Sequence, residues 1–364
     1  MKIFPAQARR GLTALSLLIC ASLPVSGLAQ TASPAQAAFT DSAVTGLGAN
    51  RRVAITSVIV SFQSSVAATK QGGSGMFADK TSSQSVLAMP VADTVMQQEI
   101  AEQAYSRLKA DLTAAGYEVL SEGEVTASPV YQQITKTAGF PNPTKFGNAL
   151  GDAMLVSPAA LTPYLPYAAE GSQFEQPKSY IGYLSRMGGA STTPGGPSMV
   201  SIGRIWALPS QEVQLAKALN AHVVKATYVV TLGETATSRK RTLGGYRIEE
   251  NAKGQALAQV GLLADQTRIS FRTADGNAKW QKVSYMKPAP AKDGDVVVRL
   301  AQSIEGGTDH FSLRSSSSQG GLFNPGADFQ FRFFADIKDP EGYAAEVNAM
   351  IADADKAMVE LVRK

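Results

Sequence analysis

The sequence predicts an α/β (α+β) fold in which helices flank one mixed β-sheet. Residues 53–62 are rich in β-branched residues, which favours a buried strand. An amphipathic stretch at 93–115 follows, and Gly116 separates it from a short apolar segment at 117–120. A second helix–strand unit, 213–220 and 223–232, repeats the pattern later in the chain. Alternating strands and helices predict a mixed sheet, because a crossover between parallel strands needs a helix to cover the sheet face.

The stretch at 93–115 has the features of a helix with one buried face. Asp93 is a residue type favoured at helix N-caps. The apolar residues that recur at every fourth position are Met96, Ile100, Ala104, Leu108 and Leu112. This spacing places them along one side of a helix. Gly116 can adopt the left-handed conformation that commonly ends a helix, so we expect the chain to turn there into the next strand.

The second half of the chain predicts further strands and a final helix. Residues 267–273 alternate between polar and apolar, 274–277 has hairpin-turn composition, and 280–286 is the expected return strand. Runs at 296–300 and 329–333 predict two more strands, and the Ser- and Gly-rich stretch 306–326 between them is expected to be a loop. A C-terminal amphipathic helix is predicted over 340–363. Its apolar face consists of Val347, Ile351, Ala354, Met358, Leu361 and Val362.

The N-terminus predicts export. Lys2, Arg9 and Arg10 precede an apolar run at 12–23, which has only about half the ~20 residues needed to span a bilayer, and small residues follow at 27–29. We interpret residues 1–29 as a signal peptide. Cleavage after Ala29 leaves 335 residues (364 minus 29) without cysteine, because Cys20 is the only one. Export without disulfides predicts the periplasm or outer membrane of a Gram-negative bacterium.

The mature chain is expected to be one domain. Residues 30–50 are rich in Ala, Ser, Thr and Gly without a hydrophobic period, and they predict a flexible lead-in. Residues 51–364 predict a single α/β domain with an insertion at about 126–210. The full chain has a formal net charge of +4, and losing the three basic residues of the signal leaves +1 (4 minus 3). Such a balance gives no reason to expect nucleic-acid binding.

The insertion at 126–210 is dense in proline, glycine and tyrosine. Proline at this density disfavours helices and interior strands. One interpretation is a surface insertion without a binding role. The other is an aromatic surface that contacts a polymer or a partner protein, because tyrosine gives a large contact area at low entropic cost. The candidate partner-contact residues are Tyr164, Tyr167, Tyr180 and Tyr183, together with Phe77 in the earlier loop.

Catalytic chemistry has little support in the sequence. The two histidines, His222 and His310, lie far apart, and only Asp309 neighbours His310 as a pairing group. The mature chain lacks a thiol, and no histidine pair has the spacing of a metal site. Glu122 and Glu124 are acids on alternate residues after a strand, and a glycosidase would need two acids across a cleft. No catalytic, cofactor or metal residue is predicted, and no cofactor is expected.

The segments at 53–62, 93–124, 215–233 and 267–276 together resemble a group of bacterial envelope proteins. The likeness is to the curli secretion channel subunit, the lipoprotein activators of peptidoglycan synthases and the TolB N-terminal domain, through "helix, small residue, strand, Gly" and "strand ending Asp-Gly" segments. The resemblance implies the same mixed sheet. It also implies that 72–90 takes the place of a pore-narrowing loop and 234–262 the place of a membrane-crossing hairpin.

These observations lead to one main hypothesis and two alternatives. The main hypothesis is a non-enzymatic exported cell-envelope protein that acts as a binding or scaffold platform for another envelope protein or polymer. The first alternative is an oligomeric outer-membrane export channel component of the curli-channel type, with 234–262 and 300–335 in the membrane. The second is a secreted hydrolase. Outer-membrane association and homo-oligomerisation are left open by the sequence.

Overall fold

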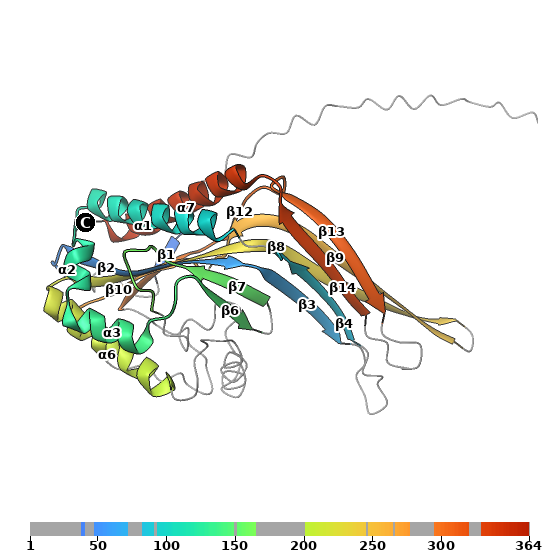
Figure 1. Cartoon of the computed structure of the whole chain (residues 1–364), viewed down its shortest axis with the longest axis horizontal. Helices are drawn as coiled ribbons and strands as arrows, with labels where there is room; N and C mark the ends of the chain where they lie inside the picture. The colour runs from blue at the N-terminus through green and yellow to red at the C-terminus, as the bar shows by residue number, and fades with distance from the viewer. Residues whose placement is uncertain are drawn as a thin grey trace, which may run out of the picture.

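The computed structural model shows an α/β body from which a two-layered β-arm projects (Figure 1). It describes residues 38–40, 47–71, 82–90, 93–148, 151–164, 201–244, 247–264, 266–276, 295–319 and 329–363. Within these residues the strands form a ten-stranded sheet and a four-stranded sheet. Helices cover both faces of the larger sheet in the body (Figure 1). The predicted fold class, a mixed sheet flanked by helices with a C-terminal helix, is confirmed.

The centre of the large sheet is the parallel pair β2 (Arg52–Gln63) and β8 (His222–Gly244). On the β8 side follow β10 (Arg268–Arg272), β11 (Val296–Leu300) and β1 (Ala38–Thr40). On the β2 side follow β7 (Gly151–Val156) and β6 (Thr144–Asn148), and the short β5 (Glu118–Val119) pairs with β2 in parallel. β9 (Arg247–Leu262) pairs with β8, and β12 (Ile304–Glu305) pairs with β9.

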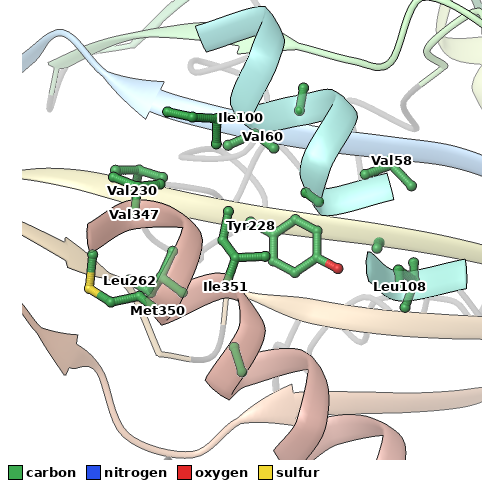
Figure 2. Packing of buried hydrophobic residues seen from close by; sticks show 14 of the residues in the cluster. Val58, Val60, Ile100, Leu108, Tyr228, Val230, Leu262, Val347, Met350 and Ile351 are labelled. Atoms are coloured by element: carbon green, nitrogen blue, oxygen red, sulfur yellow. The ribbon is translucent and has the colours of Figure 1, made fainter. Parts of the chain in front are cut away.

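One face of this sheet is apolar and is covered by two helices, α1 (Thr94–Ala114) and α7 (Pro340–Val362). Figure 2 shows side chains of both helices meeting those of β2 and β8, such as Ile100 with Val60 and Ile351 with Tyr228. The carboxylate of Asp93 accepts hydrogen bonds from the first backbone N–H groups of α1, as its N-cap position predicts. Gly116 follows α1 with a φ of 93°, the left-handed region predicted for it.

The opposite face carries α2 (Glu122–Thr126), α3 (Pro129–Ala138) and α6 (Ser201–Leu219). The first half of the predicted insertion is therefore folded, since α3, β6 and β7 all lie within 126–164. Proline does not prevent this. Pro129 occupies the first turn of α3, where a backbone N–H would have no partner within the helix. The helix predicted at 213–220 is the end of α6, which begins at Ser201 and contains Pro209.

The arm is formed where a second sheet stacks on the outer part of the β8–β9 hairpin (Figure 1). This sheet has the order β13 (Phe311–Gln319), β14 (Phe329–Ile337), β4 (Ser82–Ala88), β3 (Ser65–Gln71). The prediction of a loop over 306–326 was wrong for β13. Serine has low strand propensity, but the backbone ladder with β14 runs unbroken from Phe311 to Gln319 and needs no apolar pattern.

The lead-in predicted for residues 30–50 also contains structure. Ala38–Thr40 form an edge strand on β11, and Leu47 is buried in the core. A three-residue edge strand can be held by backbone pairing alone, so it leaves no hydrophobic period in the sequence. The predicted signal peptide at 1–29 and the predicted return strand at 280–286 lie outside the described residues.

One acidic residue interrupts the apolar face. Asp355 of α7 is fully buried, and it accepts a hydrogen bond of 2.6 Å from the hydroxyl of Tyr228. Burial raises the pKa of the Asp355 carboxyl well above its usual range, because desolvation disfavours the carboxylate. Asp111 acts in the same direction, whereas the Tyr228 hydrogen bond and Arg107 oppose it. The folded state therefore favours the protonated, neutral acid.

Replacing Asp355 with Asn is expected to stabilise the protein at neutral pH. An acid whose folded pKa is raised loses stability as the pH rises above its unfolded pKa of about 3.9, by about 1.4 kcal/mol per pH unit until the folded pKa is reached. The amide introduced by Asp355→Asn stays neutral, so the advantage of this variant over the wild type should grow from pH 5 to pH 8. Urea unfolding at four pH values measures it. Asp353→Asn, at a half-buried position of the same helix, is the control and should give wild-type midpoints. A constant difference between Asp355→Asn and the wild type would contradict the prediction.

Candidate binding surface

The arm begins at a bulge in the β8–β9 ladder, where Gln259 and Val260 of β9 lie opposite Leu232 of β8. The pairing of β8 with β9 shifts register between Thr231 and Gly233, and Gly233 has a φ of 125°. A Cβ atom at Gly233 would lie 2.0 Å from the carbonyl oxygen of Leu257 on β9. Only glycine fits this position, for both steric and conformational reasons. A bulge bends a strand and increases its twist, so this one sets the direction in which the hairpin leaves the body.

Small residues and hydroxyl groups join the two layers of the arm. Ser83 and Ser85 of β4 are fully buried against the hairpin. The hydroxyl oxygens of Ser85 and Thr235 lie 2.5 Å apart, and the Thr237 hydroxyl donates to the Ser83 oxygen at 2.9 Å. Buried hydroxyls without such partners would destabilise the interface, so the layers are held in one register by these pairs.

The layers also approach closely at one glycine. A Cβ atom at Gly254 of β9 would lie 2.3 Å from the Cγ atom of Phe331 on β14. The aromatic ring therefore packs directly on the backbone of the hairpin. This contact gives the interface an apolar centre beside its hydroxyl pairs.

The outward faces of the arm are mostly polar. Among the hairpin residues whose burial the structure describes, the exposed ones are Glu234, Ala236, Ser238, Lys253, Gln255 and Leu257. On the second sheet, the exposed residues of the face turned away from the hairpin include Ser312, Arg314, Gln330 and Arg332. Arg314 is fixed there by Asp336, whose carboxylate lies 2.8 Å from its guanidinium. These faces offer charged and hydrogen-bonding groups over an extended sheet, which suits contact with a large partner.

A histidine joins the arm to the body. The Nε2 atom of His310, directly before β13, lies 2.5 Å from a carboxylate oxygen of Glu346 on α7. Its Nδ1 atom lies 3.4 Å from the carboxylate of Asp339, the N-cap of α7. The other Glu346 oxygen accepts a hydrogen bond from the Gly307 backbone N–H at 2.8 Å. His310 thus contacts α7 rather than its sequence neighbour Asp309, and its position is structural.

A buried ionic network lies on the face of the large sheet beneath α6. Glu212 of α6 contacts Lys225 of β8 at 2.9 Å and Arg272 of β10 at 3.3 Å. Arg272 also contacts Asp295 at 3.3 Å, and Asp295 accepts a hydrogen bond from the Thr273 backbone N–H at 2.7 Å. Because these charges are buried and engaged with one another, we interpret the network as the attachment of α6 to the sheet.

The prediction that Tyr164 contacts a partner was wrong. Only 1% of Tyr164 is exposed, and its hydroxyl lies 2.5 Å from the Thr56 hydroxyl on β2. Its ring packs edge-on against Tyr131 of α3, with the ring centroids 6.3 Å apart. The hydroxyl finds a partner inside the protein, which allows a tyrosine to be buried. The other candidates, Tyr167, Tyr180, Tyr183 and Phe77, lie outside the described residues.

The acids considered for catalysis have structural partners. Glu122 accepts hydrogen bonds from Tyr105 at 2.6 Å and Lys109 at 2.9 Å, and these bonds lower the pKa of its carboxyl to about 2. Glu124 forms a capping box with Ser121 at the start of α2. The pattern that suggested an acid pair is thus a helix N-terminus. An S-x-x-E spacing before the helix was the signal that could have identified it.

His222 is buried at the start of β8, and its Nε2 atom lies 3.3 Å from the backbone oxygen of Asn50. Within the described ranges, no group of three or more His, Cys, Asp or Glu residues is arranged to hold a metal ion. Across that same part of the chain, every helix is too short or too polar to cross a membrane.

Comparison with known proteins yields no relative. No family model matches the chain, and no curated protein and no solved structure matches it. The sequence predicted part of β14 at 329–333, but it did not predict β3, β4 and β13, because their segments have the composition of loops.

Replacing Gly254 with Ala is expected to destabilise the arm by about 1–3 kcal/mol, because the new methyl group would overlap Phe331 and force the layers apart. Urea unfolding, with hydrogen exchange of the β9 and β14 amides, measures the effect. Adding Phe331→Leu to Gly254→Ala should recover part of the lost stability, because the smaller side chain leaves room for the new methyl group.

Gly123→Ala serves as the matched control for this prediction. Gly123 lies in α2, and nothing surrounds the position of its Cβ within 4 Å. That variant should be neutral or slightly stabilising, by at most about 1 kcal/mol. Equal stability of the two Gly→Ala variants would show that the layers are not in tight contact at Gly254.

Proposed function

We propose that the chain is a non-enzymatic, exported cell-envelope protein that acts as a scaffold, and that the arm is the surface with which it binds another envelope protein or polymer. The observation that supports this most is the construction of the arm. A glycine bulge, paired hydroxyls and one close glycine–aromatic contact hold two stacked sheets whose outward faces are polar and exposed. A rigid platform of this kind binds with little loss of conformational entropy.

The residues considered for chemistry fit this proposal. Glu122 and His310 each hold a neighbouring element in place, and Glu124 caps its own helix, α2. The alternative of a secreted hydrolase depends on an acid pair beside a cleft. Of the two acids that suggested it, Glu122 hydrogen-bonds to α1 and Glu124 caps α2. We therefore rank the hydrolase below the scaffold.

The export-channel alternative is supported by the position of one element. The paired strands β8 and β9 include residues 234–244 and 247–262, within the segment where the resemblance implies a membrane-crossing hairpin. However, Glu234 and Lys253 are exposed on it. A lysine that faces lipid at the bilayer midplane costs about 2–4 kcal/mol. We therefore place the channel second, as a proposal that rests on the hairpin alone.

A photo-crosslinking side chain in place of Arg332 tests the scaffold. Arg332 is exposed on the outward face of the arm, whereas Glu360 is exposed on α7 in the body and provides the matched control position. After irradiation of living cells, Arg332 variants should yield adducts with a different molecule, at masses other than twice that of the chain, and Glu360 variants should yield few. Adducts from Glu360 alone would contradict the role of the arm.

Osmotic-shock fractionation of the same cells tests export and separates the alternatives. Soluble release with the periplasm, with the N-terminus processed near Ala29, is expected for the scaffold. A large detergent-requiring assembly in the outer membrane would favour the export channel, and retention in the cytosol with an intact N-terminus would contradict both.

A further inference from the structure

β13 is an edge strand of the arm. It pairs with β14 on one side, and no other described strand pairs with its second side. Lys338 donates its backbone N–H to the His310 carbonyl at 2.9 Å. Residues 310 and 338 are therefore a hydrogen-bonded pair, which determines which residues of β13 direct their backbone groups toward β14. Because antiparallel strands alternate the direction of their backbone groups, residues 312, 314 and 316 point theirs toward β14. Residues 313, 315 and 317 therefore point their N–H and C=O groups outward.

This edge lacks the devices that usually prevent edge pairing. It contains no proline, and its register with β14 has no bulge. Its single charge, Arg314, is held by Asp336 on its own sheet. The side chains from Ser312 to Ser316 are all exposed, and Leu313 is 45% exposed. Long, regular edges of this kind are templates for another strand.

We propose that β13 pairs antiparallel with β13 of a second copy of this chain, about a two-fold axis through Ser315. The two four-stranded sheets would then form one continuous sheet of eight strands (4 plus 4). Overlap of all nine residues of β13 requires this centre, and outward-pointing residues then meet in pairs 313–317 and 315–315. A centre one residue earlier would place Arg314 opposite its own copy, which is unfavourable for like charges.

A second copy fits this edge better than an unrelated peptide. Domains that bind peptides by strand addition obtain specificity from pockets beside the edge. Beside β13 the described side chains are serines, one arginine already paired and one leucine, which give no selectivity for a foreign sequence. The register centred on Ser315 places Arg314 opposite a serine, so no like charges lie directly opposite each other, and a two-fold contact satisfies both edges at once.

Cysteine crosslinking in the full chain with Cys20→Ser tests the proposal, since this background has no other thiol. The axis places residue 315 opposite itself, at a Cα separation of about 5.5 Å, which allows a disulfide. Ser315→Cys should form a disulfide-linked dimer on mild oxidation. Ser312→Cys is equally exposed but would lie roughly 20 Å from its copy and should stay monomeric on a reducing-agent-free gel. Linkage of both variants, or of neither, would overturn the proposal.

A proline substitution provides an independent test that leaves the ladder with β14 intact. Ser315→Pro removes only an outward N–H, a position where an edge strand tolerates proline. Sedimentation equilibrium should show a dimer for the wild type and for Ser315→Ala, and at least a tenfold weaker dimer for Ser315→Pro with an unchanged unfolding midpoint. A monomeric wild type, or an equally tight Ser315→Pro dimer, would overturn the proposal. Both assays use purified protein, so their outcome is independent of whether the scaffold function holds.

Discussion

The strand β8 is the element on which the rest of the structure depends, because it belongs to the body and to the arm. In the body it pairs with β2 and β10 and contributes Tyr228 and Val230 to the apolar core. Beyond the Gly233 bulge it continues as the arm, where Thr235 and Thr237 reach the second sheet. The bulge in the β8–β9 ladder and the left-handed backbone of Gly233 lie at the point where the hairpin leaves the body, so local backbone geometry contributes to the orientation of the arm.

The two faces of the large sheet are stabilised by different interactions. The face under α1 and α7 is mostly apolar, with Gln97, Asn348 and the Tyr228–Asp355 pair as buried polar groups, so its contribution is mainly hydrophobic. The face under α6 includes the network of Glu212, Lys225 and Arg272. Removing any one of these side chains would leave a buried charge without its partner and so lower the stability of the folded protein. Within the arm, paired hydroxyls lie beside apolar contacts such as those of Leu87 and Phe331. Hydrogen bonds and close steric contacts therefore contribute more to the positioning of the strands in the arm than to that of the elements in the body.

The parts of the fold that the sequence predicts are those with a strong apolar pattern. β2, α1 and α7 follow from β-branched runs and fourfold spacing, because burial of one face requires that spacing. β13 and β1 could not be predicted, since both are held by backbone pairing, which any sequence can make. α3 was missed because Pro129 was treated as a helix breaker, although it lies in the first turn. Tyr164 shows the limit for the site: composition does not reveal whether a tyrosine hydroxyl has a partner inside the protein.

The proposed pairing through β13 and the proposed binding through the arm are compatible, and together they would have a consequence for affinity. A two-fold axis perpendicular to the sheet keeps the same face of each copy on the same side. The outward faces with Gln330 and Arg332 would then form one surface twice as large, and neither residue lies on the paired edge. A repetitive envelope polymer could contact both halves at once, which converts the second contact into an intramolecular step and increases the overall affinity without new side chains. Pairing of the β13 edges would thus increase the affinity of the outward face of the arm for its partner, although the contact made by each copy is small and polar.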